Sequence, residues 1–73
     1  NSDFSVFPNP AGTDFNIETD KEFSQVDILN LQGKNVKTVN TKTVQISELP
    51  AGIYFLRVTL KNGYEKTVKL IKD

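Results

Sequence analysis

Apolar and polar residues alternate along most of this chain, and no stretch keeps apolar residues at helical spacing over ten positions. Alternation with a period of two is the pattern of a β-strand that buries one face. The longest example covers residues 53–60, with Tyr54, Leu56 and Val58 on one side and Phe55 on the other. We therefore expect this stretch to be the central strand of an all-β domain.

The turn before that strand combines Pro50 with Gly52. Proline fixes φ and lacks an N–H donor, and glycine adopts a positive φ without steric cost. The pair is expected to deliver the chain into the strand in a single register. We expect Leu49 to close one end of the core and Tyr54 to fill it.

Other alternating stretches, separated by turn residues, predict the remaining strands. Together with the central one they cover residues 4–7, 14–18, 24–31, 35–39, 43–47, 53–60 and 64–71. Pro8, Asn9 and Pro10 form a rigid turn after the first strand, and Gly33 turns a hairpin in the middle. The dipeptide at 62–63 predicts a type I′ hairpin, in which both residues have positive φ. Six or seven short strands at roughly ten-residue spacing predict an immunoglobulin-like antiparallel β-sandwich.

The inward positions of these strands define the expected core. Its members are Phe4, Val6, Phe15, Ile17, Val26, Ile28, Val36, Val44, Ile46, Leu49, Tyr54, Leu56, Val58, Leu60, Val68 and Leu70. At about 1.5–3 kcal/mol per buried side chain, these residues can stabilise one sandwich. None are left over to line a cleft. Ile53 and Phe55 form an outward apolar pair, which another segment or a partner is expected to cover.

The length and composition agree with a single small domain over residues 1–73. The chain has 73 residues, of which 37% are hydrophobic and 25% charged, with a net charge of zero. A core of this size leaves little volume for an internal ligand site, so we expect recognition on the outer surface. The charge balance argues against nucleic-acid binding. Without an initiator Met, a signal peptide or a long apolar run, the chain looks like a piece of a longer protein.

The candidate chemistry is sparse. The chain has no cysteine and no histidine, which removes disulfides, thiol chemistry and the commonest general base and metal ligand. The carboxylates of Asp14, Glu18, Asp20, Glu22 and Asp27 each fit a solvated strand face or a turn. Weak Ca²⁺ binding near Asp20 and Glu22 is the alternative. We expect no catalytic residue, no cofactor and no dedicated metal site.

Four segments match a known family in order and spacing. They are residues 7–10, 26–36, 49–58 and 66–72. Together they resemble the type A C-terminal sorting domain of type IX secretion cargo, also called the Por secretion system. The resemblance spans residues 4–72, and the family's immunoglobulin-like β-sandwich agrees with the strand pattern.

The resemblance implies a non-enzymatic, cleavable address at the C-terminus of a larger secreted protein of Gram-negative bacteria. Its implied partners are the type IX translocon, an outer-membrane shuttle protein and a sortase-like cysteine protease. They would carry the cargo from the periplasm across the outer membrane and attach it to surface lipopolysaccharide. The protein is thus expected to be secreted or at the cell surface, without inserting into the membrane itself.

The resemblance implies that recognition involves the last strands, where main-chain edges and exposed lysines are the expected binding surface. The recognition residues it implies are Gly63, Lys66, Thr67, Lys69, Leu70 and Lys72. The motif residues read as structural: Pro8, Asn9, Pro10, Gly33, Leu49, Gly52 and Tyr54. The alternative function is an adhesion or carbohydrate-binding module, motivated by Phe55. The terminal Asp73 departs from the basic or apolar ending that is common in the family.

Overall fold

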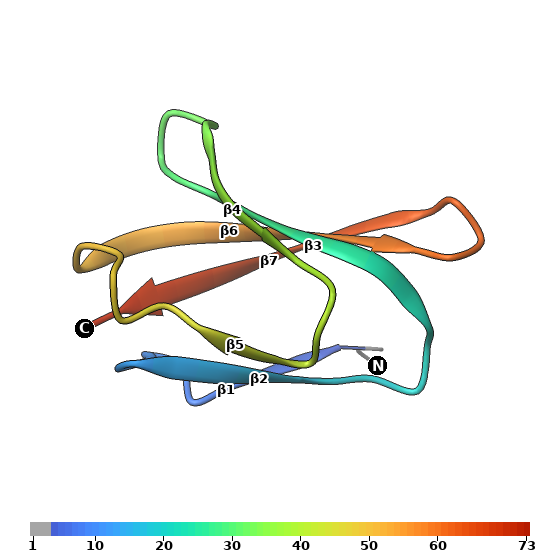
Figure 1. Cartoon of the computed structure of the whole chain (residues 1–73), viewed down its shortest axis with the longest axis horizontal. Helices are drawn as coiled ribbons and strands as arrows, with labels where there is room; N and C mark the ends of the chain where they lie inside the picture. Colours follow the sequence, from blue (N-terminus) through green and yellow to red (C-terminus); the bar gives the residue numbers. More distant parts are fainter. Residues whose placement is uncertain (1–3) are drawn as a thin grey trace.

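A computed structural model describes residues 4–73, which form seven β-strands. They are β1 (Ser5–Phe7), β2 (Asp14–Glu18), β3 (Phe23–Leu29), β4 (Asn35–Val39), β5 (Thr43–Gln45), β6 (Gly52–Leu60) and β7 (Glu65–Lys72). A three-stranded sheet in the order β1-β2-β5 faces a four-stranded sheet in the order β4-β3-β6-β7 (Figure 1). All paired strands are antiparallel. The prediction of an all-β sandwich is confirmed. None of the described residues belongs to a helix long and apolar enough to cross a membrane.

The strand order is that of an immunoglobulin-like sandwich. β1, β2 and β5 take the places of strands A, B and E, while β4, β3, β6 and β7 take those of C′, C, F and G. The turn before β6 carries the tyrosine corner typical of such folds, because the Tyr54 hydroxyl donates to the Pro50 carbonyl at 2.6 Å. Gly52 begins β6 with a φ of 152°, as expected of its position.

The core lies between the two sheets and follows the predicted alternation. Its buried members are Phe4, Ala11, Phe15, Ile17, Val26, Ile28, Val44, Ile46, Tyr54, Leu56, Val58, Leu60 and Leu70. Val6, Leu49 and Val68 are partly buried and pack against them. The fully buried Ala11 was not predicted, because a single alanine between turn residues gives no periodic signal.

Val36 does not join the core, so that prediction is wrong. It is 37% exposed. The pairing of β3 with β4 shifts there, since Ile28 faces Lys37 while the next residue, Leu29, faces Asn35. Val36 is the extra residue of a β-bulge, and Val39 packs against the core in its place.

The two hairpins of the four-stranded sheet use the same three-residue loop, and the prediction of a type I′ turn is wrong. Gly33 and Gly63 have φ values of 84° and 95°, and no described residue other than glycine has a positive φ. The Gly33 N–H donates to the Asn30 carbonyl at 2.9 Å, and the Gly63 N–H donates to the Leu60 carbonyl at 3.0 Å. This is a type I turn closed by a glycine in the left-handed region.

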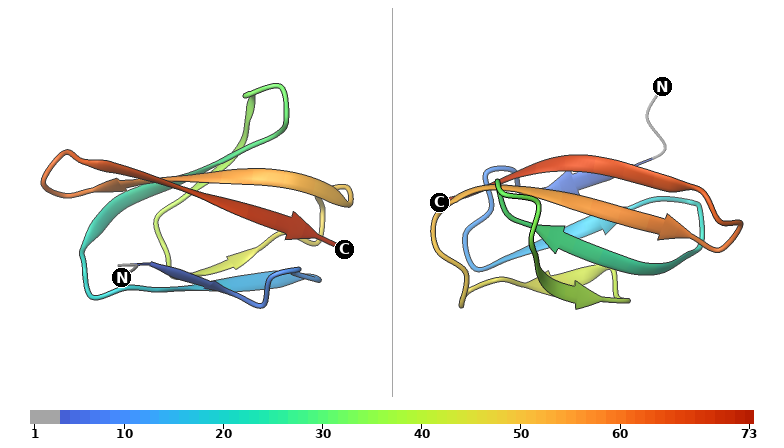
Figure 2. Two further views of the ribbon diagram at one scale, coloured as in Figure 1. Left: turned by 180° about the vertical axis from the view of Figure 1, so that it is seen from behind. Right: turned by 90° about the horizontal axis from the view of Figure 1, so that it is seen from above.

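The β6–β7 hairpin is the longest pair in the molecule, and its tip projects beyond the three-stranded sheet at one end (Figures 1 and 2). The register is continuous, from Gly52 opposite Lys72 to Thr59 opposite Glu65. Among the described strands β7 pairs with β6 alone, so it is an edge strand of the four-stranded sheet.

Candidate functional site

The side chains of β7 alternate between the core and the outer face of the sheet. Leu70 is fully buried, and Val68 packs against the core. Lys66 therefore falls on the inward parity near the loop, where it is exposed, while Thr67 and Lys69 are exposed on the outer face. Leu70 cannot meet a partner through its side chain in the folded domain, and its contribution is to hold β7 on the core.

The three lysines of the last strand do not form one cluster. Lys66 pairs in register with Val58, Lys69 with Phe55 and Lys72 with Gly52. At about 3.3 Å per residue, Lys66 and Lys72 lie roughly 20 Å apart along the strand. Gly63 is exposed in the loop at the Lys66 end.

The turn between β1 and β2 covers the C-terminal end of the β7 edge. The Asn9 side chain donates from Nδ2 to the Lys69 carbonyl at 3.1 Å, and its Oδ1 accepts from the Ile71 N–H at 3.0 Å. Ala11 continues the pairing, because its N–H donates to the Ile71 carbonyl at 2.7 Å and its carbonyl accepts from the Asp73 N–H at 2.8 Å. The Asn9 amide thus takes the place of a peptide group in a neighbouring strand.

This contact was missed from the sequence, which gave Asn9 only the role of a turn residue. The bonded residues are separated by 60 and 62 positions along the chain. The prolines on either side of Asn9 have no N–H donor, so the segment pairs with β7 through the Asn9 side chain. Both X–Pro bonds of the segment are cis.

The remainder of the β7 edge is not covered by any other described part of the chain. The bonds to Asn9 and Ala11 involve the odd-numbered residues Lys69, Ile71 and Asp73. Hydrogen-bonding groups alternate in direction along an edge strand. The backbone groups of Glu65 and Thr67 and the N–H of Lys69 therefore point to the same side. Within residues 4–73 no group bonds to them. A stretch of regular strand remains available for pairing.

A surface hollow of about 460 Å³ adjoins the open edge at the loop end. Leu60 and Tyr64 supply its apolar part, and the rest of its lining comes from Asn62, Glu65 and the two lysines Lys21 and Lys66. Tyr64 is 71% exposed. The hollow therefore combines an uncovered aromatic ring with two lysines and one glutamate, beside backbone groups that have no partner among residues 4–73.

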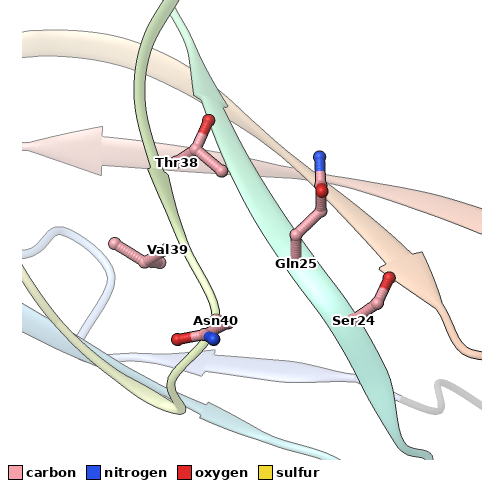
Figure 3. A pocket seen from close by; sticks show the side chains of 5 residues that line it. All are labelled: Ser24, Gln25, Thr38, Val39 and Asn40. Atoms are coloured by element: carbon pink, nitrogen blue, oxygen red, sulfur yellow. The ribbon is translucent and has the colours of Figure 1, made fainter.

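A second hollow, of about 360 Å³, lies where β4 diverges from β3 (Figure 3). It is lined by Ser24, Gln25, Thr38, Val39 and Asn40. None of these side chains is ionisable, so the hollow offers no acid, base or charged ligand group.

Asp27 on the outer face of β3 is only 3% exposed, which corrects the expectation of a solvated carboxylate. It accepts hydrogen bonds from Thr38 Oγ1 at 2.8 Å and from Asn35 Nδ2 at 3.1 Å. Gln25 Nε2 at 3.1 Å and Arg57 Nη2 at 3.3 Å complete the set. Burial alone would raise the pKa of the Asp27 carboxyl, but the bonds from Thr38, Gln25, Arg57 and Asn35 outweigh it and lower that pKa. Arg57 Nε is buried without a partner among the described residues, but both Asp27 oxygens accept hydrogen bonds from donors of the same sheet, so this cluster supports the fold.

The other candidate chemistry does not assemble in the part of the chain that is described. No three acidic side chains among residues 4–73 come together as a metal-holding group. Glu22, the Ca²⁺ candidate, faces Lys61 at 3.7 Å. Phe55 is half-buried between its cross-strand neighbours Leu29 and Lys69, so it does not stand free as a sugar-stacking platform.

The comparisons with known proteins decide the family. The secretion system C-terminal sorting domain matches residues 5–73, from β1 to the end of the chain. The chain belongs to this family. It is a sorting domain of the type IX, or Por, secretion system. No curated protein matches the chain in sequence. The sorting domain is a non-catalytic secretion signal, which engages the type IX machinery and directs its cargo across the outer membrane.

Proposed function

We propose that the secretion machinery contacts this sorting domain at its last hairpin, residues 63–73. The observation that supports the proposal is the edge of β7 from Glu65 to Lys69, whose outward backbone groups have no partner among residues 4–73. Lys66 and Lys69 lie on the two faces of the same stretch and are both exposed. A small domain that serves as an address is read through its surface, and an open edge with flanking charge offers both affinity and orientation.

The domain forms the C-terminal end, residues 1–73, of a larger secreted cargo. Its partners are the outer-membrane translocon and shuttle protein, followed by a sortase-like protease that removes it and joins the cargo to surface lipopolysaccharide. The cargo is then secreted or held at the cell surface. Family membership supports this route.

The motif residues serve the fold in this proposal. Pro8, Asn9 and Pro10 close the end of the β7 edge, Gly33 closes a hairpin loop, and Leu49, Gly52 and Tyr54 form the corner that leads into β6.

The test is an export assay. The domain is fused to the C-terminus of a reporter that carries a signal peptide, in a bacterium with a type IX system. We expect the double substitution Lys66→Glu and Lys69→Glu to reduce the reporter outside the outer membrane by about tenfold or more, because two attractive contacts become repulsive. The reporter should accumulate in the periplasm.

The matched control is Lys34→Glu with Lys42→Glu, which makes the same charge change at exposed positions outside β7. It should be exported like the unmodified domain. Thermal unfolding of each variant separates loss of recognition from loss of the fold. Normal export of the β7 variant, or an equal block by the control, would overturn the proposal.

A further inference from the structure

We infer that the secretion machinery reads the last hairpin by β-strand addition, in which an extended segment of a partner protein pairs with β7 between Glu65 and Lys69. This inference rests on the proposed function and specifies its mode. The segment is acidic and carries one apolar side chain that anchors it.

The main chain supplies the contact. Both backbone groups of Glu65, both of Thr67 and the N–H of Lys69 point away from β6 without a partner among residues 4–73. Strand addition satisfies such groups with the ladder of an incoming chain, so most of the affinity comes from backbone hydrogen bonds. A partner can therefore bind this edge of the sorting domain with little dependence on the sequence of the attached cargo.

Asn9 limits the register. Its amide already occupies the Lys69 carbonyl and the Ile71 N–H, so an incoming strand ends at Lys69. The open stretch measures roughly five residues, or about 16 Å of strand. The added segment is consequently short and held in one position along β7.

The opposite edge of the same sheet does not offer this template. β4 is interrupted by the bulge at Val36, and the Lys37 N–H already bonds to the Asn35 side chain at 3.1 Å. Bulges are one of the devices that protect sheet edges from added strands. β7 keeps an unbroken register with β6 and has no such protection before Lys69.

The chemistry of the segment follows from the hollow beside the edge. Side chains of an added strand alternate between the two faces, and those on the inner side point toward Lys66 and the hollow. Leu60 and Tyr64 there suit an apolar side chain, and Lys21 and Lys66 suit a neighbouring carboxylate. On the outer side, Lys69 favours a second acid. Glu65 lines the same hollow and opposes part of this attraction, but the three lysines Lys21, Lys66 and Lys69 outnumber it. The surroundings of the edge therefore favour an acidic segment over a basic one.

The deciding variant is Thr67→Pro, measured in the same export assay. Proline removes the central N–H of the open edge and places its ring where the added strand would lie. The Thr67 N–H points away from β6, so the β6–β7 ladder keeps its bonds. We expect export to fall by about tenfold or more, as for loss of a required main-chain contact. Thr67→Val keeps the N–H and should be exported normally.

Thermal unfolding of the 73-residue chain shows whether the proline variant is folded. Lys69→Pro, which removes the open N–H at the C-terminal end of the stretch, provides a second variant with the same expected loss. Normal export by a folded Thr67→Pro or Lys69→Pro variant would overturn strand addition. A block by Thr67→Val as strong as by Thr67→Pro would also overturn it, because the side chain would then be what is read.

The two proposals fail in different ways. If the Lys66→Glu and Lys69→Glu variant is blocked while both proline variants are exported, the hairpin is read through its side chains and only strand addition is lost. If all of them are exported, the last hairpin is not the contact.

A second copy of the chain is the alternative occupant of the β7 edge. Sedimentation of a dimer that Thr67→Pro dissociates, with export unchanged, would assign the edge to self-association and overturn the inference.

Discussion

At the scale of single residues, Tyr54 shows how one polar atom is accommodated in an apolar core. Its ring is buried among the side chains of the core, and its hydroxyl reaches the Pro50 carbonyl four residues earlier. The bond ties the turn before β6 to the strand itself. Tyr54 is therefore both a core residue and a fastening for the corner.

We predict that Tyr54→Phe lowers the free energy of unfolding by about 0.5–1.5 kcal/mol, the usual net value of one hydrogen bond. Urea unfolding at pH 7 measures the change. The matched control is Tyr64→Phe, because Tyr64 is 71% exposed and its hydroxyl has no partner among residues 4–73. The control should stay within about 0.5 kcal/mol of the unmodified domain. Equal effects of the two changes would contradict a special role of the corner.

At the scale of elements, the two hairpins of the four-stranded sheet depend on glycine for the same reason. In each loop the third residue has positive φ, which lets the strand after it rejoin the ladder. Gly63 sets the start of β7 in this way. The position of the open edge thus depends on one backbone angle in the loop before it.

We predict that Gly63→Ala destabilises the domain by about 1–2 kcal/mol, because a side chain is strained at a φ of 95°. No group beyond the adjacent residues lies within 4 Å of the added methyl group, so the cost comes from its contact with the local backbone and not from packing. Gly12→Ala is the matched control, since Gly12 also has open space and lacks a positive φ. Thermal unfolding should show a lower midpoint for the first variant only. A comparable drop at Gly12 would rule out the backbone explanation.

At the scale of the whole molecule, charge pairs on the sheet make stability depend on pH. The pKa of Asp27 is lowered by its four hydrogen-bond donors despite burial, and the pKa of the exposed Glu48 is lowered mainly by a hydrogen bond from Lys37. A carboxyl with a lowered pKa in the folded state stabilises the fold above its unfolded pKa near 4. That contribution is lost as the pH falls through the folded-state value.

We predict that the domain is less stable at pH 3 than at pH 7, and that Asp27→Asn flattens this dependence. At pH 7 the variant should lose about 1–3 kcal/mol, because the buried amide cannot accept all four hydrogen bonds. Urea unfolding at several pH values measures both effects. Glu48→Gln should keep most of the slope, since the Glu48 carboxylate is exposed. A slope for Asp27→Asn as steep as that of the unmodified domain would contradict this account.

Much of the fold could be predicted from the sequence because its signals are local. The alternation in β2 and β6 placed Phe15, Ile17, Leu56 and Val58 in the core, where the structure has them. The prediction that Val36 is buried was wrong because a bulge depends on how two strands pair, and the alternation within one strand does not reveal that pairing. The prediction of a type I′ turn was wrong because Asn-Gly is also compatible with a type I turn followed by a glycine in the left-handed region.

The candidate site divides in the same way. The sequence alone determined the strands, the sandwich, the family and the last hairpin as the candidate contact, because each depends on periodicity or on motifs of neighbouring residues. The tertiary structure decided that Leu70 is buried, that Asp27 is enclosed by donors from three strands, and that Asn9 and Ala11 cover the C-terminal end of the β7 edge. These features arise only when strands that are distant in the chain become neighbours. The physical reason is that burial and the pairing of a sheet edge are properties of the folded assembly, not of any one segment.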